Sequence, residues 1–566
     1  MAVGLAWSAT TRAEVRFEAE GAERALLDNL RSHLALAAEP CDAPDWRVRR
    51  LFAKTERDLQ PALQAFGYYR AEVEKHLELG EDCWQAQVTI ALGERVHVRS
   101  RVVEVRGDAA DDPALDDVLA GLPLPEGAPL HHGRYEEIKS RLREFAAARG
   151  YLDFKLERHQ LRIHPDDSAA DIEIRVDSGP RYRLGELRFG DLPFDDDFVH
   201  RLVALDSGQP YLASDLTGLD RRLGGSGYFG RVEVLPRRDK AVDGAIPVDL
   251  VLEAAPRHVW RAGVGYATDT GPRLSLGYTA RYVNRHGHRF ESEMRLSPVE
   301  SGLTADYLIP GRDPNTEHYT LGLRLLRDDT KSAESDSATV FGRYTRRHGD
   351  WTVVRYLELL HESSEIASEQ ERQTLLMPGV RLQRTRADDL RRTHEGYRVS
   401  LELRGAHDDL LSTTTLLQLR GSAKGIHRFG DSGRITLRAD AGGTLVDNTS
   451  DLPASLRFFA GGDNSVRGYA FESLGPKNSN GQVVGGRHLL VGSLEYEHPV
   501  VGEDWWGAAF IDAGNAFDPG QFDTKVGYGV GLRWFSPVGR VRLDLAFPRD
   551  TERDDWRLHF ALGVDL

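Results

Sequence analysis

No run of about 20 apolar residues, the length that a membrane-spanning helix requires, occurs in the 566-residue sequence. This absence excludes an apolar spanning helix within these residues. It does not exclude a membrane β-barrel, whose strands carry apolar side chains only at every second position. Since 40% of the residues are hydrophobic and 28% are charged, the composition is also not that of a disordered chain.

An excess of positive charge is absent as well. The sequence has 73 Lys and Arg against 88 Asp and Glu, which gives a formal net charge of −15. Because the phosphates of nucleic acids are bound by basic surfaces, this balance predicts that the chain has no nucleic-acid partner.

Cysteine is scarce, with Cys41 and Cys83 as the two occurrences. An even, low number suits an oxidising compartment, in which the two thiols can form a disulfide. Two unrelated buried thiols fit the sequence equally well, since sequence does not show whether the two Cα atoms approach each other. The disulfide therefore stays one of two open interpretations.

The first residues, "MAVGLAWSATTRAEV", contain neither the basic start nor the apolar core of about 7–15 residues that mark a secretory signal. We interpret residues 1–14 as the residual end of an export segment or as a disordered start.

A repeat organises the next 240 or so residues. Each copy has an amphipathic helical stretch that ends at a glycine followed by tyrosine, at Gly67, Gly150 and Gly227, and then alternating segments. Glycine at these points suits a helix C-cap with positive φ. The spacing of about 80 residues predicts three domains, each with strands and two helices. Their predicted bounds are residues 15–95, 96–181 and 182–256.

From residue 257 to the end, apolar and polar side chains alternate with period two, which is typical of strands. A soluble sandwich buries its apolar face, whereas a membrane barrel turns that face to lipid, so alternation alone fits both. An even number of segments, about 16 and mostly about 9–13 residues long, favours a transmembrane barrel. The segments begin near Val259, Leu274, Phe290, Leu303, Tyr319, Ala338, Val353, Leu375, Tyr397, Leu416, Ile435, Leu489, Ala508, Val526, Val541 and Leu558.

A long loop predicted at residues 447–487 carries Arg467 at a glycine-lined tip, Val466 to Tyr469, where it is the one charged residue. As a water-exposed loop it would carry an ordinary surface charge. As a loop folded into the barrel lumen, it would need carboxylate partners for a desolvated guanidinium, and the strand alternation points Asp512 and Glu495 inward. We predict that the loop is a plug or strut latched to the inner wall. The predicted latch residues are Val466, Arg467, Gly468, Tyr469, Glu495 and Asp512.

These stretches resemble a known family. "GGDNSVRGY" is similar to the loop motif of the outer-membrane assembly factors, the superfamily of BamA and the two-partner secretion transporters. "FIDAG", from Phe510 to Gly514, is similar to the companion F-x-D-x-G strand motif. The three N-terminal units resemble POTRA domains, and their number is most similar to the TamA-type members. The resemblance implies α+β POTRA domains followed by an all-β, 16-stranded antiparallel transmembrane barrel.

The resemblance also implies a function. Members of this kind assemble and insert outer-membrane proteins, autotransporters included, and they do so without enzymatic chemistry. They lie in the outer membrane of Gram-negative cells, with their N-terminal domains in the periplasm. The implied partners are unfolded outer-membrane protein clients, the lipid bilayer and a TamB-like inner-membrane-anchored protein that spans the periplasm. Clients would enter at the seam between the first and last strands, where Gly263, Gly265 and Gly563 weaken packing. A two-partner-secretion-type polypeptide transporter remains the alternative.

We predict no catalytic residues, cofactor or metal, because the sequence offers no nucleophile–base set and no cofactor motif. The phrase "LHHGRYEE" (residues 130–137) contains two adjacent histidines, but it opens a predicted helix. Capping and surface roles are therefore the interpretation that we adopt for both histidines.

Overall fold

The computed structural model describes residues 13–80, 83–330, 332–366, 369–389, 392–430, 433–536, 539–550 and 555–563. The predicted export segment, residues 1–14, therefore lies almost entirely outside the described residues. The described chain forms two compact units, one built from N-terminal segments and one that contains the C-terminal half. No described helix is long and apolar enough to cross a membrane.

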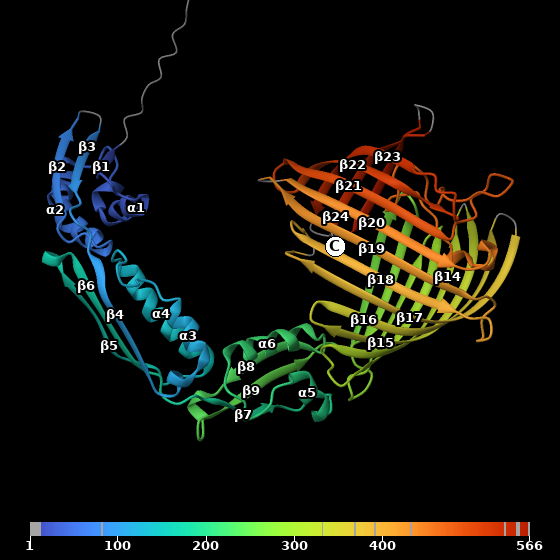
Figure 1. The fold of residues 1–566 in the computed structure, drawn as a ribbon, viewed down its shortest axis with the longest axis horizontal. Helices are drawn as coiled ribbons and strands as arrows, with labels where there is room; N and C mark the ends of the chain where they lie inside the picture. The colour runs from blue at the N-terminus through green and yellow to red at the C-terminus, as the bar shows by residue number, and fades with distance from the viewer. Residues whose placement is uncertain are drawn as a thin grey trace, which may run out of the picture. The chain divides into compact units, whose positions relative to one another are not determined.

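Three mixed sheets, each of three strands, form the N-terminal part (Figure 1). In each sheet the second alternating segment of the repeat is the central strand, and the first strand of the sheet runs parallel to it. The first sheet has β1 (Glu14–Glu18), β3 (Trp84–Ala91) and β2 (Glu72–Leu79), with α1 (Arg24–His33) and α2 (Asp45–Ala65). The second has β4 (His97–Arg106), β6 (Ala169–Asp177) and β5 (Lys155–His164), with α3 (Pro113–Ala120) and α4 (His132–Arg149). The third has β7 (Arg183–Phe189), β9 (Ala245–Ala254) and β8 (Phe229–Pro236), with α5 (Asp196–Val203) and α6 (Ala213–Gly225).

The repeat glycines take the conformation that the sequence predicts. Gly67, Gly150 and Gly227 have φ of 88°, 87° and 77° and follow α2, α4 and α6. His131 caps α4, since its Nδ1 accepts a hydrogen bond of 3.0 Å from the N–H of Gly133. A capping histidine is what the interpretation of "LHHGRYEE" expected. The domain bounds given above remain a prediction.

Cys41 and Cys83 form a disulfide with their Cα atoms 4.5 Å apart. It joins the segment before α2 to the start of β3, across a separation of 42 residues. A cross-link that closes a loop of this length restricts the unfolded chain, and the loop-entropy relation gives roughly 4 kcal/mol of stabilisation.

We expect the Cys41→Ser/Cys83→Ser variant of the full chain to lose roughly this much stability in its first sheet. Amide hydrogen exchange of residues 13–92 measures the loss, and exchange of the C-terminal strands is the internal control. Equal exchange of residues 13–92 in variant and wild type would contradict the expected contribution.

The C-terminal half forms one antiparallel sheet of 16 strands, in chain order from β10 to β25. Every predicted segment start falls within a different one of these strands. The predicted order of folds, α+β units followed by a 16-stranded antiparallel barrel sheet, is thereby confirmed. The strands are β10 (His258–Ala267), β11 (Gly271–Ala280), β12 (Arg289–Leu296), β13 (Glu300–Pro310), β14 (Glu317–Asp329), β15 (Ala333–His348), β16 (Trp351–Ile366), β17 (Glu369–Ala387), β18 (Gly396–Ala406), β19 (Leu416–Phe429), β20 (Gly433–Leu445), β21 (His488–Val501), β22 (Trp505–Phe517), β23 (Lys525–Ser536), β24 (Gly539–Pro548) and β25 (Arg557–Gly563).

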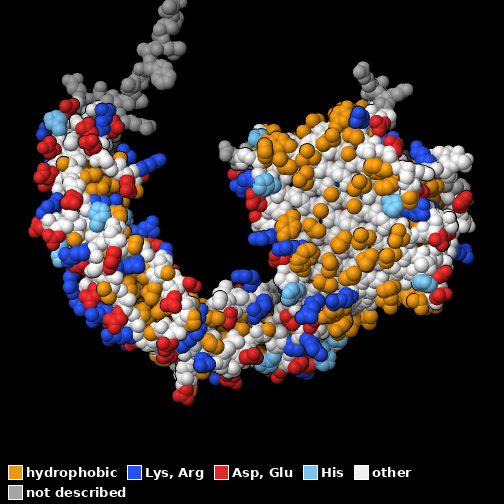
Figure 2. Space-filling model, in the orientation of Figure 1, with side chains coloured by type: hydrophobic (Ala, Val, Ile, Leu, Met, Phe, Trp, Pro, Cys, Tyr) orange, Lys and Arg blue, Asp and Glu red, His pale blue; other side chains and the backbone are white. Residues whose placement is uncertain are grey.

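The two faces of this sheet differ as a membrane barrel requires. Along β21, Leu490 and Leu494 are exposed on the outer face, whereas Glu495 and Glu497 are buried on the inner one. Figure 2 shows hydrophobic side chains spread over the visible outer surface of the barrel with few charged side chains among them. The apolar side chains thus lie on the outside of the barrel and not in a sandwich core. Such an outer surface is suited to contact with lipid.

Three neighbouring strands exceed the predicted length by three residues or more. Strands β15, β16 and β17 have 16, 16 and 19 residues, against the expected 9–13 or so. The paired residues Ser335↔Ser364 and Asp336↔Ser363 lie near the ends of β15 and β16, where polar side chains stand on both faces. The period-two signal stops there, but the backbone ladder continues.

Candidate functional site

The segment between β20 and β21, residues 446–487, packs against the inner wall of the barrel. Val466, Arg467 and Tyr469 are buried. Apolar side chains of this loop form one cluster with Leu489, Val491 and Ala516 of β21 and β22. The cluster members from the loop are Phe458, Ala460, Val466, Tyr469 and Leu474. The loop is therefore held by hydrophobic packing as well as by the charges described next.

Arg467 is the centre of the charged contacts between loop and wall. Its Nε and Nη2 donate to the two carboxylate oxygens of Asp512 at 2.7 and 2.9 Å. Its Nη1 donates to Glu495 at 2.6 Å and to Asp544 at 3.0 Å. The guanidinium carbon lies 3.4 Å from the ring centroid of Phe510. This one side chain thus connects the loop to β21, β22 and β24.

Three further arginines extend these contacts into a buried ion network. Arg533 donates to Glu495 at 2.8 Å and contacts Asp544. Arg540 contacts Glu497, to which Arg434 donates at 2.8 Å. The network as defined here contains Arg434, Arg467, Arg533, Arg540, Glu495, Glu497, Asp512 and Asp544, each at most 5% exposed. The formal charges of these described residues cancel, which is the condition for burying so many ions.

The remaining members of the predicted motifs lie close to this network. Phe510 is buried under Arg467, and Gly468 donates its N–H to Nε2 of His559 at 3.0 Å. The hydroxyl of Tyr469 lies 3.5 Å from the carbonyl oxygen of Val526. At Gly514, φ is 151°, and a Cβ would lie 2.2 Å from the carbonyl oxygen of Leu490. The structure thus brings the loop motif and the strand motif together.

Glycine on β23 makes room for the loop. A Cβ on Gly527 would lie 1.8 Å from the carbonyl oxygen of Arg467, well inside contact distance. Gly527 is paired with Asp512, and Gly531 is paired with Asp544, so each carboxylate faces a position without a side chain. Gly527 therefore gives the loop backbone room to dock, while Gly531 leaves space for the side chains of Asp544 and Arg533.

Half of the network does not follow from the sequence. Asp544, Arg533, Arg540 and Arg434 were not predicted as site residues, although the alternation placed Asp544, Arg533 and Arg540 on the polar face. Period two identifies the face of a strand, but it does not give the height of a residue along the barrel axis. The strand register was the missing information.

The first barrel strand, β10, and the last, β25, contact each other near the C-terminal end of β10. The sheet order ends at β10 on one side and at β25 on the other, with no ladder between them among the described residues. Thr268, just after β10, donates its N–H to the oxygen of Phe560 at 3.4 Å, and Phe560 donates its N–H to the Thr268 hydroxyl at 3.0 Å. Trp260 and Val264 on β10 are 77% and 86% exposed. At this seam the described parts of β10 and β25 are thus joined by contacts around Thr268 and not by a ladder.

The predicted seam glycines lie on these two strands. Gly263 is paired with Ser275 and Gly265 with Arg273 on β11, while Gly563 is paired with Arg540 on β24. Their weakening effect on the seam remains a prediction.

Residues 261–565 match the Omp85 superfamily domain, and residues 16–92 match the POTRA domain described as TamA domain 1. The outer membrane protein assembly factor BamA of Nitratidesulfovibrio vulgaris is 23% identical over 401 residues, which cover 65% of this chain and 49% of that protein. The chloroplastic outer envelope protein 80 of Arabidopsis thaliana is 35% identical over 136 residues, 22% of this chain and 16% of that protein. The chain therefore matches about half, or less, of the length of these relatives.

Among solved structures, BamA from Haemophilus ducreyi lacking POTRA domains 1–3 has a TM-score of 0.68. It is 15% identical and covers 83% of this chain and 100% of that one. Likeness at this identity shows a shared fold.

Proposed function

The chain belongs to the Omp85 superfamily, and from that premise we propose that it is a non-enzymatic assembly factor that inserts outer-membrane proteins at the seam between β10 and β25. It is an outer-membrane β-barrel protein whose N-terminal POTRA domains lie in the periplasm. The observation that carries the proposal is the seam itself. A strand edge with exposed apolar side chains and free backbone groups offers an incoming client strand both hydrogen bonds and a lipid-facing surface.

The mechanism requires no covalent chemistry. An unfolded client strand adds to the free edge of β10 by β-augmentation, and its own next strand then adds to it. Each added strand forms hydrogen bonds with backbone N–H and C=O groups that would otherwise lack partners in the bilayer. These hydrogen bonds favour insertion of the growing client sheet into the membrane. The buried network holds the rest of the wall rigid while the seam changes partners.

Within the superfamily we propose a TamA-type role, with autotransporters among the clients and a TamB-like periplasm-spanning protein as partner. The match of residues 16–92 to a TamA-type first POTRA domain supports this assignment. So does the number of N-terminal sheets, three in the described chain. The proposed domains are residues 15–95, 96–181 and 182–256, followed by the barrel at 257–566.

A client-folding assay tests the proposal. We expect the full-length protein in liposomes to accelerate the folding of two unrelated clients, an eight-stranded outer-membrane barrel and an autotransporter, by at least about tenfold over empty liposomes. Heat-modifiable migration of each client on a gel reports its folding. Acceleration of neither client would contradict an assembly role. A single polypeptide that becomes protease-protected inside the liposome, with no barrel inserted, would instead support the two-partner-type transporter.

A further inference from the structure

One residue of the inward loop, Asp463, contacts the first-strand side of the seam. The Thr268 hydroxyl donates to both carboxylate oxygens of Asp463, at 3.0 and 3.1 Å. The N–H of Asp463 donates to the carboxylate of Asp269 at 2.6 Å. Thr268 and Asp269 form the turn that joins β10 to β11, so the loop is tied to the outer end of the first strand.

The same residue also contacts the last strand. Nδ1 of His559, on β25, lies 2.5 Å from the carboxylate of Asp463. Nε2 of the same ring accepts the N–H of Gly468. Because Nε2 acts as an acceptor, the ring proton is assigned to Nδ1, which donates to Asp463. His559 therefore holds β25 to two separate positions of the loop.

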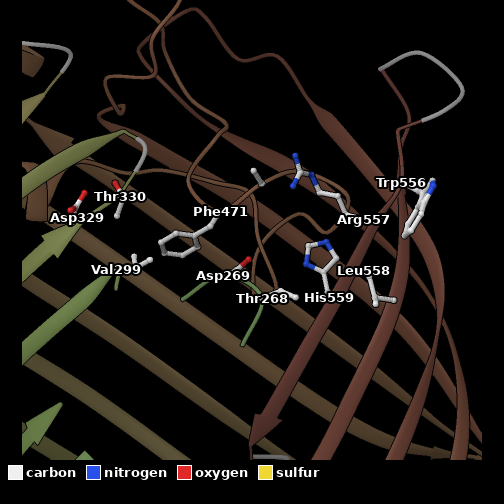
Figure 3. Close-up of a pocket in the computed structure, with 11 residues that line it drawn as sticks. Thr268, Asp269, Val299, Asp329, Thr330, Phe471, Trp556, Arg557, Leu558 and His559 are labelled. Carbon is white, nitrogen blue, oxygen red and sulfur yellow. The ribbon is translucent and has the colours of Figure 1, made fainter. Parts of the chain in front are cut away.

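These contacts are protected from water on one side and border open space on the other. Asp463 and His559 are 3% and 5% exposed. A cavity of about 530 Å³ lies beside them, and Figure 3 shows Asp269 and His559 among its lining side chains, with Phe471 from the loop. Side chains at a cavity wall separate with less disruption of packing than side chains inside a core.

The contacts also include an unfavourable pair. Burial, with the nearby charge of Asp463, raises the pKa of Asp269 to about 6. The repulsion between the carboxylates of Asp269 and Asp463 opposes the hydrogen bonds that Asp463 accepts from Thr268 and His559. The other charged groups that line the adjoining cavities are Arg273, Asp329, Lys424, Arg540, Arg542 and Arg557.

We infer that Asp463, Thr268 and His559 form a clasp that holds the outer end of the seam closed and couples seam opening to movement of the inward loop. Asp463 binds both sides, so the sides separate only when it releases one of them. The inference rests on the proposed function, because it regulates the seam at which clients are proposed to enter. It differs from the Arg467 latch, because the carboxylates that bind Arg467 lie on β21, β22 and β24 and not on either seam strand.

Amide hydrogen exchange of the full-length protein in lipid nanodiscs tests the clasp. In Asp463→Ala, exchange in the β10–β11 turn and in β25 is expected to accelerate by at least about tenfold, since charge-assisted hydrogen bonds on both sides are lost. Exchange in β16 and β17 should not change. Asp447→Ala is the matched control, because Asp447 is an exposed carboxylate of the same loop. Heat-modifiable migration verifies that each variant contains a folded barrel.

A second variant covers the case in which Asp463→Ala does not fold. Thr268→Val keeps the side-chain shape and removes the hydroxyl, and the clasp predicts the same acceleration at the turn and at β25. Unchanged exchange at the seam in a folded Asp463→Ala or Thr268→Val protein overturns the clasp. The result is independent of assembly activity: faster seam exchange in a protein whose wild type fails to fold clients would retain the clasp and refute the proposed function.

Discussion

Replacing Arg467 with alanine is expected to release the inward loop while the barrel still forms. The substitution leaves three arginines facing four buried carboxylates, and removal of one partner from a buried ionic group typically costs about 3–5 kcal/mol. The lost contacts all join the loop to the wall, so the loop bears the effect rather than the strand ladder. We propose on this basis that Val466, Arg467, Gly468 and Tyr469 act as the latch, with Asp512 and Glu495 as its receptor.

Chymotrypsin digestion of the protein in native membranes measures this release. The enzyme cleaves after aromatic residues, and Phe458 and Tyr469 are buried in the wild-type loop. Cleavage there should appear in Arg467→Ala while heat-modifiable migration of the barrel persists. Arg467→Lys should give an intermediate result, because lysine keeps the charge but not the bidentate geometry. Lys477→Ala, which removes an exposed cation of the same loop, is the matched control. Full protection of the loop in Arg467→Ala would refute the latch.

The physical cause of the release is separately testable. If the uncompensated carboxylates are responsible, then neutralising one of them restores part of the loss. Addition of Asp512→Asn to Arg467→Ala is therefore expected to recover part of the loop protection, although neither variant retains the original ion pair. A double variant that is cleaved faster than Arg467→Ala would assign the effect to lost packing with Phe510 instead.

The parts of this site that could be predicted from the sequence are those whose direction follows from the alternation of side chains along a single strand. Alternation placed Glu495 and Asp512 on the inner face, and the glycines around Arg467 indicated a loop in close contact with another backbone. The approximate position of each strand along the chain was likewise accessible, because lipid-facing side chains recur at every second residue over most of each strand. Asp544 and Arg533 were not paired with Arg467 in advance, since their meeting depends on strand register across the sheet.

The clasp was inaccessible for a different reason. Asp463 lies in an irregular loop, where no period relates sequence position to direction in space. His559 stands in an alternating strand, and its inward direction follows from that alternation. Its hydrogen-bond partners, Asp463 and Gly468, do not follow from it, because both lie in the loop, and Asp463 in turn binds a residue about 290 positions before His559. Contacts of this kind are set by the closure of the whole barrel.

Cross-linking the seam is expected to abolish client assembly. Tyr266 and Phe560 lie across the seam with ring centroids 6.3 Å apart, outside the clasp. A Tyr266→Cys/Phe560→Cys variant, joined by a short thiol cross-linker or a disulfide, keeps the last strand on the first. Because a client strand needs the free edge of β10 to pair, its folding should fall to the rate in empty liposomes, and reduction of a disulfide-locked sample should restore it.

Two controls distinguish the effect of the cross-linked seam from the effects of the cross-linker and the reductant. Val264 and Leu274 are paired between β10 and β11, so a Val264→Cys/Leu274→Cys cross-link joins strands that are already hydrogen-bonded. It should leave assembly unchanged. Wild-type protein exposed to the same reductant accounts for opening of the Cys41–Cys83 bridge, which is far from the barrel in the sequence. A fully locked seam with undiminished client folding would show that clients take another route, because a closed ladder has no edge left to offer an incoming strand.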